Sequence, residues 1–122
     1  MAERLRAIRG ATTLDEDTKG QVIQRTSELL RTIFERNELR HDDLVSIVFT
    51  ATDDVRSEFP AAAARSIGIS DVPLLCAREL DVQGAIGLCI RVLIHAYSDR
   101  KPSALRHVYL EAARPLRTDL PQ

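Results

Sequence analysis

Arg91 is the only charge in the run from Leu88 to Ile94, which otherwise suits a strand buried on both faces. Burying a guanidinium without a partner costs several kcal/mol even after the protein relaxes. Arg91 therefore needs a carboxylate. That carboxylate can come from the protein, for example from Glu79, or from a ligand.

Further arginines lie in or beside other predicted strands. They are Arg9 and Arg106, with Arg65 on a predicted short helix and Arg117 near the C-terminal end. A guanidinium presents a planar fork of donors that matches a carboxylate and stays charged at every relevant pH. The set favours a site for a ligand that carries carboxylates. Simpler explanations remain open, because Arg9 can be a strand-end side chain that reaches solvent and Arg91 can form an internal ion pair.

Other candidates have equally ordinary alternatives. Glu79 follows Cys76 by three residues at a strand exit, where it is either a solvated loop carboxylate or an acceptor for a ligand hydroxyl. Cys76 alone fits a small core residue, and Tyr109 alone fits a half-buried aromatic. Phe59 fits the start of a helix. The residue pattern by itself leaves these alternatives open.

Several catalytic templates are absent from the sequence. There is no P-loop, GxGxxG or GxSxG motif, and His41, His95 and His107 have no metal-ligand spacing. A metal-dependent or covalent mechanism is therefore disfavoured. Cys76 and Cys89 lack CxxC spacing, so reduced thiols and a cytoplasmic location are expected.

The length of the chain and its net charge limit the classes of partner that this protein can bind. The 122 residues fit one compact domain over residues 1–122. A net charge of -1, from 17 basic and 18 acidic residues, gives no basic footprint for nucleic acid or an anionic membrane. No apolar stretch approaches the roughly 20 residues needed to cross a bilayer. We expect a small-molecule ligand and neither a nucleic-acid nor a membrane partner.

The hydrophobic pattern predicts an α+β fold, a mixed five-stranded sheet with one long and one short helix. The long helix begins at a capping box between Thr18 and Gln21 and ends near Asn37. Pro73 places its strand at an edge or makes it a strand start. The tail over residues 114–122 is expected to be extended and mobile unless a ligand orders it. The strands are predicted over residues 5–12, 44–50, 72–76, 88–94 and 107–110, and the short helix runs from Pro60 to about Gly68.

Five segments, taken together in order and spacing, resemble the monofunctional chorismate mutases of the AroH class. The resemblance extends from Arg6 to Leu120. It implies a homotrimer, described as a trimeric pseudo α/β barrel, with active sites between neighbouring subunits. It also implies conversion of chorismate to prephenate in aromatic amino-acid biosynthesis without metal or cofactor. The segments are residues 8–13, 59–65, 72–79, 89–92 and 106–110.

The resemblance also implies roles for individual residues. Arg91 would reach the ether oxygen and a carboxylate of the substrate, and Arg9 would hold a carboxylate. Glu79 and Cys76 would meet the ring hydroxyl. Tyr109 would contact a carboxylate.

A second group of roles involves the subunit interface and the tail. The resemblance implies that Phe59 and Arg65 are donated by the adjacent subunit. Leu116 and Arg117 resemble the segment that closes over the site, although Thr118 stands where the family commonly has proline.

The implied chemistry fits the inventory of residues. A Claisen rearrangement is unimolecular and requires no nucleophile, acid, base or metal, so a fixed cation such as Arg91 and restraint of the substrate must supply the rate. A lone copy would leave an apolar sheet face exposed, which predicts an oligomer. The alternative function is a non-catalytic trimeric binder of small dicarboxylate metabolites. A purely structural interaction protein leaves the arginines unexplained.

Overall fold

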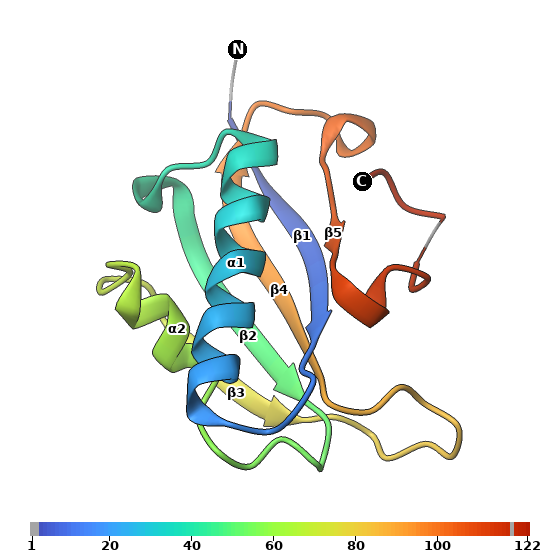
Figure 1. Ribbon diagram of the computed structural model, residues 1–122. Helices are drawn as coiled ribbons and strands as arrows, with labels where there is room; N and C mark the ends of the chain where they lie inside the picture. Colours follow the sequence, from blue (N-terminus) through green and yellow to red (C-terminus); the bar gives the residue numbers. More distant parts are fainter. Residues whose placement is uncertain (1–2, 118) are drawn as a thin grey trace.

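The computed structural model describes residues 3–117 and 119–122. Five strands form one mixed sheet in the order β3-β2-β4-β1-β5, in which β4 is antiparallel to β1 and β2, while β3 and β5 lie parallel to their neighbours (Figure 1). The predicted α+β class is therefore confirmed. The elements are β1 (Arg4–Thr13), α1 (Lys19–Asn37), β2 (Leu44–Ala51), α2 (Ala61–Ser66), β3 (Leu74–Arg78), β4 (Cys89–Ser98) and β5 (Val108–Tyr109), with single 3-10 turns at His41–Asp43, Pro102–Ala104 and Glu111–Ala113.

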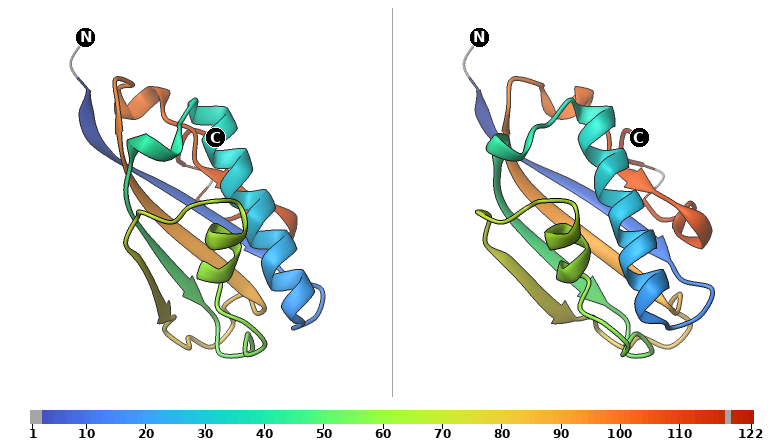
Figure 2. Two further views of the ribbon diagram at one scale, coloured as in Figure 1. Left: turned by 90° about the vertical axis from the view of Figure 1, so that its left-hand side faces the viewer. Right: turned by 60° about the vertical axis from the view of Figure 1, so that its left-hand side comes forward.

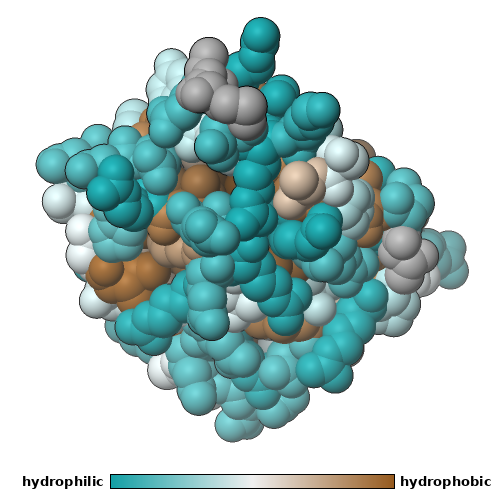
Figure 3. All heavy atoms as spheres, turned by 90° about the horizontal axis from the view of Figure 1, so that it is seen from above, coloured by the Kyte–Doolittle hydropathy of each residue, from teal (hydrophilic) through white to brown (hydrophobic). Residues whose placement is uncertain are grey.

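Both helices cover the same face of the sheet (Figure 2). Their contact with the sheet forms the main core, because alternate strand residues point toward them. The end of the molecule where β1 begins and α1 ends is mainly hydrophilic, with smaller hydrophobic patches (Figure 3). Among the described residues, no helix has the length and apolarity to cross a membrane. The largest fully buried side chains of this core include Ile8, Ile47, Phe49 and Ile94 from the sheet and Leu29, Leu30 and Ile33 from α1.

The opposite face of the sheet, which we call the open face, carries neither of the two α-helices. Along β4, buried and half-buried residues alternate, so the prediction of a strand buried on both faces is wrong for a single chain. Leu5 is 52%, Leu75 62% and Tyr97 47% exposed, and the strand registers place all three on this face. The alternation arises because the helices reach only one side of the sheet, which leaves an apolar surface uncovered on the other.

Helix α1 matches its predicted extent, but only half of the predicted capping box forms. The Thr18 hydroxyl accepts a hydrogen bond from the Gln21 backbone N–H at 3.2 Å. The Gln21 side chain accepts instead from the backbone N–H groups of Asp15 and Glu16, at 2.8 and 3.3 Å. The Thr18 N–H is already bonded to the Glu16 carbonyl at 3.1 Å, so it has no need of the side chain.

The edge strand β3 lies two residues later than predicted. Pro73 has no N–H to donate, so pairing begins at Leu74, while the Pro73 carbonyl accepts from the Ile47 N–H at 3.1 Å. The predicted edge position of this strand is confirmed. As a consequence, Glu79 directly follows the last paired residue, Arg78.

The sequence predicted an extended tail, but the described part of the tail is turned back on itself. A 3-10 turn spans Glu111–Ala113, and the Leu116 N–H donates to the Ala113 carbonyl at 3.0 Å. The Pro121 carbonyl then accepts from the His107 N–H at 2.8 Å. These backbone bonds turn the chain back toward the start of β5, because backbone groups in a folded tail still require partners.

Replacing Gly10 with alanine is expected to destabilise the fold by about 1–3 kcal/mol, because β1 and α1 approach too closely for a side chain. A Cβ at Gly10 would lie 2.8 Å from Ile33 Cδ1, 3.0 Å from the Val108 carbonyl oxygen and 3.1 Å from Leu29 Cδ1. Urea unfolding measures the change in free energy.

The matched control for this prediction is Gly20→Ala, because a Cβ there would meet nothing within 4 Å. It should stabilise the protein by about 0.5 kcal/mol through helix propensity. Equal unfolding free energies for Gly10→Ala and the unmodified protein would contradict the close approach.

Candidate active site

Arg91 and Glu79 form an ion pair at the start of β4. Arg91 Nε lies 3.0 Å from Glu79 Oε1 and 3.1 Å from Oε2. The side chains are 26% and 15% exposed, so water screens this pair only partly. The carboxylate that Arg91 requires therefore comes from the protein, as one of the two sequence alternatives proposed.

The pair leaves much of the guanidinium free. Within residues 3–117 and 119–122, the terminal nitrogens Nη1 and Nη2 of Arg91 make no hydrogen bond, and only Nε is engaged. Each terminal nitrogen carries two N–H donors. Arg91 is thus held by one edge while its other donors remain available to a ligand.

The sheet register brings other predicted residues to the same face. Ala11 pairs with Arg91 on one side and with Tyr109 on the other, and Arg91 pairs with Thr50. Directly paired residues share a face, so these four lie in one row across four strands. Arg9 is two residues before Ala11 and lies on this face as well.

Tyr109 contributes a buried hydroxyl to this surface. Its side chain belongs to a buried cluster against which Ile86 and Leu116 pack, and its hydroxyl has no hydrogen-bond partner among the described residues. Burial raises the pKa of Tyr109, while the positive charges of Arg9, Arg117 and Arg91 act in the lowering direction. The result is a neutral phenol O–H near three cations, which fits a carboxylate acceptor.

Two titratable groups beside the site have structural roles. The Nδ1 atom of His107 accepts from the Arg9 backbone N–H at 2.9 Å, which fixes the strand that carries Arg9. Burial, followed by the charges of Arg9 and Arg117, lowers the pKa of His107, so its ring is held neutral. Burial raises the pKa of Cys89 to about 11, so this thiol stays protonated and is no nucleophile.

Two further predicted arginines are engaged by other groups, and Arg117 pairs with Asp119, with Nε to Oδ1 and Nη2 to Oδ2 both at 3.1 Å. Arg106 donates to the Ser103 and Leu105 carbonyls and is thereby occupied by the backbone. Thr118, which departs from the resembled pattern, lies outside the described residues.

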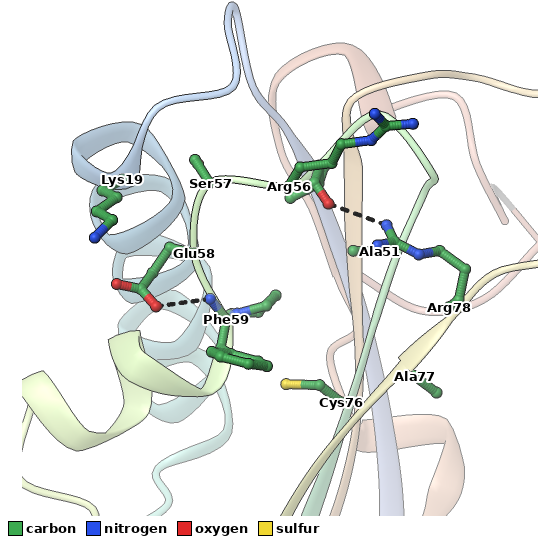
Figure 4. A pocket seen from close by; sticks show the side chains of 11 residues that line it. Lys19, Ala51, Arg56, Ser57, Glu58, Phe59, Cys76, Ala77 and Arg78 are labelled. Atoms are coloured by element: carbon green, nitrogen blue, oxygen red, sulfur yellow. Dashed lines mark hydrogen bonds between the residues drawn. The ribbon is translucent and has the colours of Figure 1, made fainter.

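Phe59 and Cys76 lie elsewhere, at a cavity of about 560 Å³ beside the edge strand. Figure 4 shows the Phe59 ring and the Cys76 thiol facing one another across it. Cys76 packs against the helix-covered core, and Phe59, just before α2, is 66% exposed. Lys19, Arg56 and Arg78 also line this cavity, which the sequence analysis did not anticipate.

Arg65 lies on α2 and lines a separate cavity, of about 540 Å³, with Ile69 and Val72. We call Phe59, Arg65 and Cys76 the α2–β3 group. Cys76 and Glu79, which the resemblance assigns to the same substrate hydroxyl, therefore lie on opposite faces of the sheet within one chain. The nine predicted residues divide into this group and an open-face group of Arg9, Glu79, Arg91, Tyr109, Leu116 and Arg117.

Thr50 is a site residue that sequence reasoning missed. Its hydroxyl Oγ1 donates to Glu79 Oε2 at 2.9 Å. A polar residue between Phe49 and Ala51 in a buried-type strand was the available signal. Only the strand register could place it beside Arg91 and Glu79. Among the described residues, no group of three or more His, Cys, Asp or Glu is arranged to hold a metal ion.

Known proteins resemble this chain in both sequence and fold. The family model described as chorismate mutase type I matches residues 5–120. The chain is 42% identical over 117 residues to chorismate mutase AroH of Bacillus subtilis (strain 168), covering 95% of this chain and 92% of that protein. It is 46% identical over 117 residues to chorismate mutase AroH of Thermus thermophilus, covering 95% and 96%. A solved structure of chorismate mutase from Clostridium thermocellum is similar at a TM-score of 0.90 and 42% identity, covering 91% of this chain and 99% of that one.

Proposed function

The chain belongs to the chorismate mutase type I family and is a chorismate mutase, and we propose that each active site combines the open face of one chain with the α2–β3 group of a second chain. The reaction is the Claisen rearrangement of chorismate to prephenate in aromatic amino-acid biosynthesis. The ether C–O bond breaks while a C–C bond forms, and no proton or electron enters or leaves the substrate. Chorismate carries two carboxylates, an ether oxygen and a ring hydroxyl, so the site must recognise all of these groups.

The observation that carries the proposed site is the half-engaged guanidinium of Arg91. Its Nε is fixed by Glu79, and its terminal nitrogens make no hydrogen bond to the described residues. Negative charge grows on the ether oxygen as the C–O bond lengthens. A preorganised cation stabilises that charge more in the transition state than in bound chorismate, which raises kcat.

Arg91 alone cannot account for catalysis. A single preorganised donor is typically worth about 2.7–4 kcal/mol. Even an acceleration of about 10⁶-fold requires roughly 8 kcal/mol. The remainder is assigned to Arg9, Tyr109 and Arg117, which would hold the two carboxylates and restrain the flexible enolpyruvyl side chain in a reactive conformer.

Glu79 has a second function in this proposal. Its carboxylate accepts from Arg91 Nε and from Thr50 Oγ1, and an ionised carboxylate offers about four acceptor positions. Oε1 therefore retains an acceptor position for the ring hydroxyl of chorismate. Catalysis by this arrangement requires no metal or cofactor.

The second chain enters the proposal for two reasons. The α2–β3 group does not reach the open-face group within one chain, and Phe59 is a largely exposed aromatic that an isolated domain has no reason to expose. The open face also presents Leu5, Leu75 and Tyr97 to solvent. We propose a homotrimer in which the open faces pack inward and each interface completes one site. Cys76 then serves the same site as Phe59 and Arg65, from the neighbour of the chain that supplies Glu79.

A cytoplasmic location is also proposed. Cys76 and Cys89 are both free thiols on separate strands, which suits a reducing compartment.

The direct test is a chorismate consumption assay on the purified protein in the presence of a chelator. We expect disappearance of chorismate with prephenate as the product. Calorimetric binding of chorismate without any spectroscopic change over time would favour the alternative, a trimeric binder of small dicarboxylates.

A further inference from the structure

We infer that Thr50 is a positioning residue for catalysis, because its hydroxyl fixes the Glu79 carboxylate that in turn orients Arg91. This inference rests on the proposed roles of Arg91 and Glu79. Thr50 is not among the residues that the sequence or the resemblance singled out.

The contacts form a chain of three side chains from three adjacent strands or their ends. Thr50 on β2 donates to Glu79 Oε2 at 2.9 Å, and Glu79 receives Arg91 Nε at 3.0 and 3.1 Å. Thr50 and Arg91 are direct partners in the β2–β4 ladder. The Glu79 backbone N–H donates to the Ala51 carbonyl at 3.0 Å, so its main chain is fixed next to Thr50 as well.

The position of Thr50 on a rigid strand explains why it is needed. Glu79 directly follows the edge strand β3 and carries a side chain with three rotatable bonds, whereas Thr50 is β-branched and restricted at χ1. A hydroxyl donor at a fixed place selects one orientation of the carboxylate. A single orientation of the carboxylate then selects one orientation of the Arg91 guanidinium through Nε.

Loss of the Thr50 hydroxyl is expected to weaken stabilisation of the transition state rather than binding of the substrate. Carboxylates of the substrate are already charged in the ground state and are held mainly by other arginines. The ether oxygen gains its charge only as the reaction proceeds, so misalignment of the Arg91 terminal nitrogens weakens transition-state stabilisation selectively. Loss of the Thr50 hydroxyl should therefore lower kcat and leave KM almost unchanged.

The test compares Thr50→Val, which keeps the shape and removes the hydroxyl, with Thr50→Ser, which keeps the hydroxyl. Hydrogen bonds to charged groups are strong enough for an effect of about tenfold or more, so we expect kcat of Thr50→Val to fall about tenfold or more with KM within about twofold. Thr50→Ser should recover kcat to within about threefold. Should Thr50→Val fail to fold, Thr50→Ala removes the same hydroxyl and carries the same expectation.

Ser46→Ala is the matched control. Ser46 lies on the same strand and face, and its Oγ is 3.2 Å from His95 Nδ1, away from Glu79. Its kcat should stay within about twofold of the unmodified protein, because the Ser46 hydroxyl is bonded to His95 and orients neither Glu79 nor Arg91. An unchanged kcat in Thr50→Val, alongside an active unmodified protein, overturns the inference, as does a purely KM effect. An inactive unmodified protein instead contradicts the proposed function itself.

Discussion

Arg91→Ala is expected to lower kcat/KM for chorismate by at least about 10²–10³-fold, the cost of removing one preorganised donor to a developing oxyanion. The loss should fall mainly on kcat, because the ether oxygen carries its extra negative charge only in the transition state. Arg91→Lys should also be strongly impaired, since an ammonium cannot bind Glu79 through one nitrogen and present a planar pair of further donors. Steady-state kinetics measure the change in kcat/KM, and thermal unfolding of each variant checks that it is folded.

Removing Arg91 also leaves Glu79 as a half-buried charge without its cation, which by itself disturbs the site. The double variant Arg91→Ala with Glu79→Gln removes that uncompensated charge. It should be no more active than Arg91→Ala if the cation acts on the substrate. Arg31→Ala, on the exposed side of α1, is the charge-matched control and should retain full turnover. Undiminished activity in Arg91→Ala would refute the assigned role.

A mixture of two inactive variants should regain activity if neighbouring chains share each site. Arg9→Ala damages the open-face group and Arg65→Ala damages the α2–β3 group. In each mixed trimer, about one site in three would combine an intact open face with an intact α2–β3 group. Co-expression with two different tags, purification of mixed trimers and assay of chorismate consumption test this.

The matched control for the mixing experiment pairs Arg9→Ala with Arg91→Lys. Both changes lie in the open-face group, so every mixed site is damaged and no activity should return. Mixed trimers of Arg9→Ala and Arg65→Ala without recovered activity would contradict the shared site. So would a clean monomer with full activity.

The ion pair between Arg91 and Glu79 changes which observation distinguishes a chorismate mutase from a non-catalytic dicarboxylate binder. The joint presence of Arg91 and Glu79 in the sequence favours an enzyme over a carboxylate binder, because a binder has no need for an acid beside its cations. The geometry gives Glu79 a structural role as well, since its carboxylate neutralises and orients Arg91. The separation between the two functions now rests on the family relationship and on turnover.

The sequence by itself determined the elements and the principal residues. The period of two of a strand by itself places Leu5, Ala7 and Arg9 on the face opposite Ile8, because side chains of a strand must alternate whatever the surrounding fold. A 3.6-residue period determined α1, and Pro73 through its missing N–H indicated an edge strand or a strand start. The isolated charge of Arg91 was sufficient to predict a carboxylate partner, but not whether the protein or a ligand supplies it.

The tertiary structure decided which residues meet. Thr50, Glu79 and Arg91 come from three separate segments, and only the parallel β2–β3 and antiparallel β2–β4 registers bring them together. The same registers place Cys76 opposite the buried Phe49 and so on the face away from Glu79, although three residues separate them in sequence. Periodicity describes each segment locally, whereas contacts between segments depend on pairing energies summed over the whole sheet. For this reason the sequence could name the charged residues of the site, and the fold alone could divide them between two surfaces.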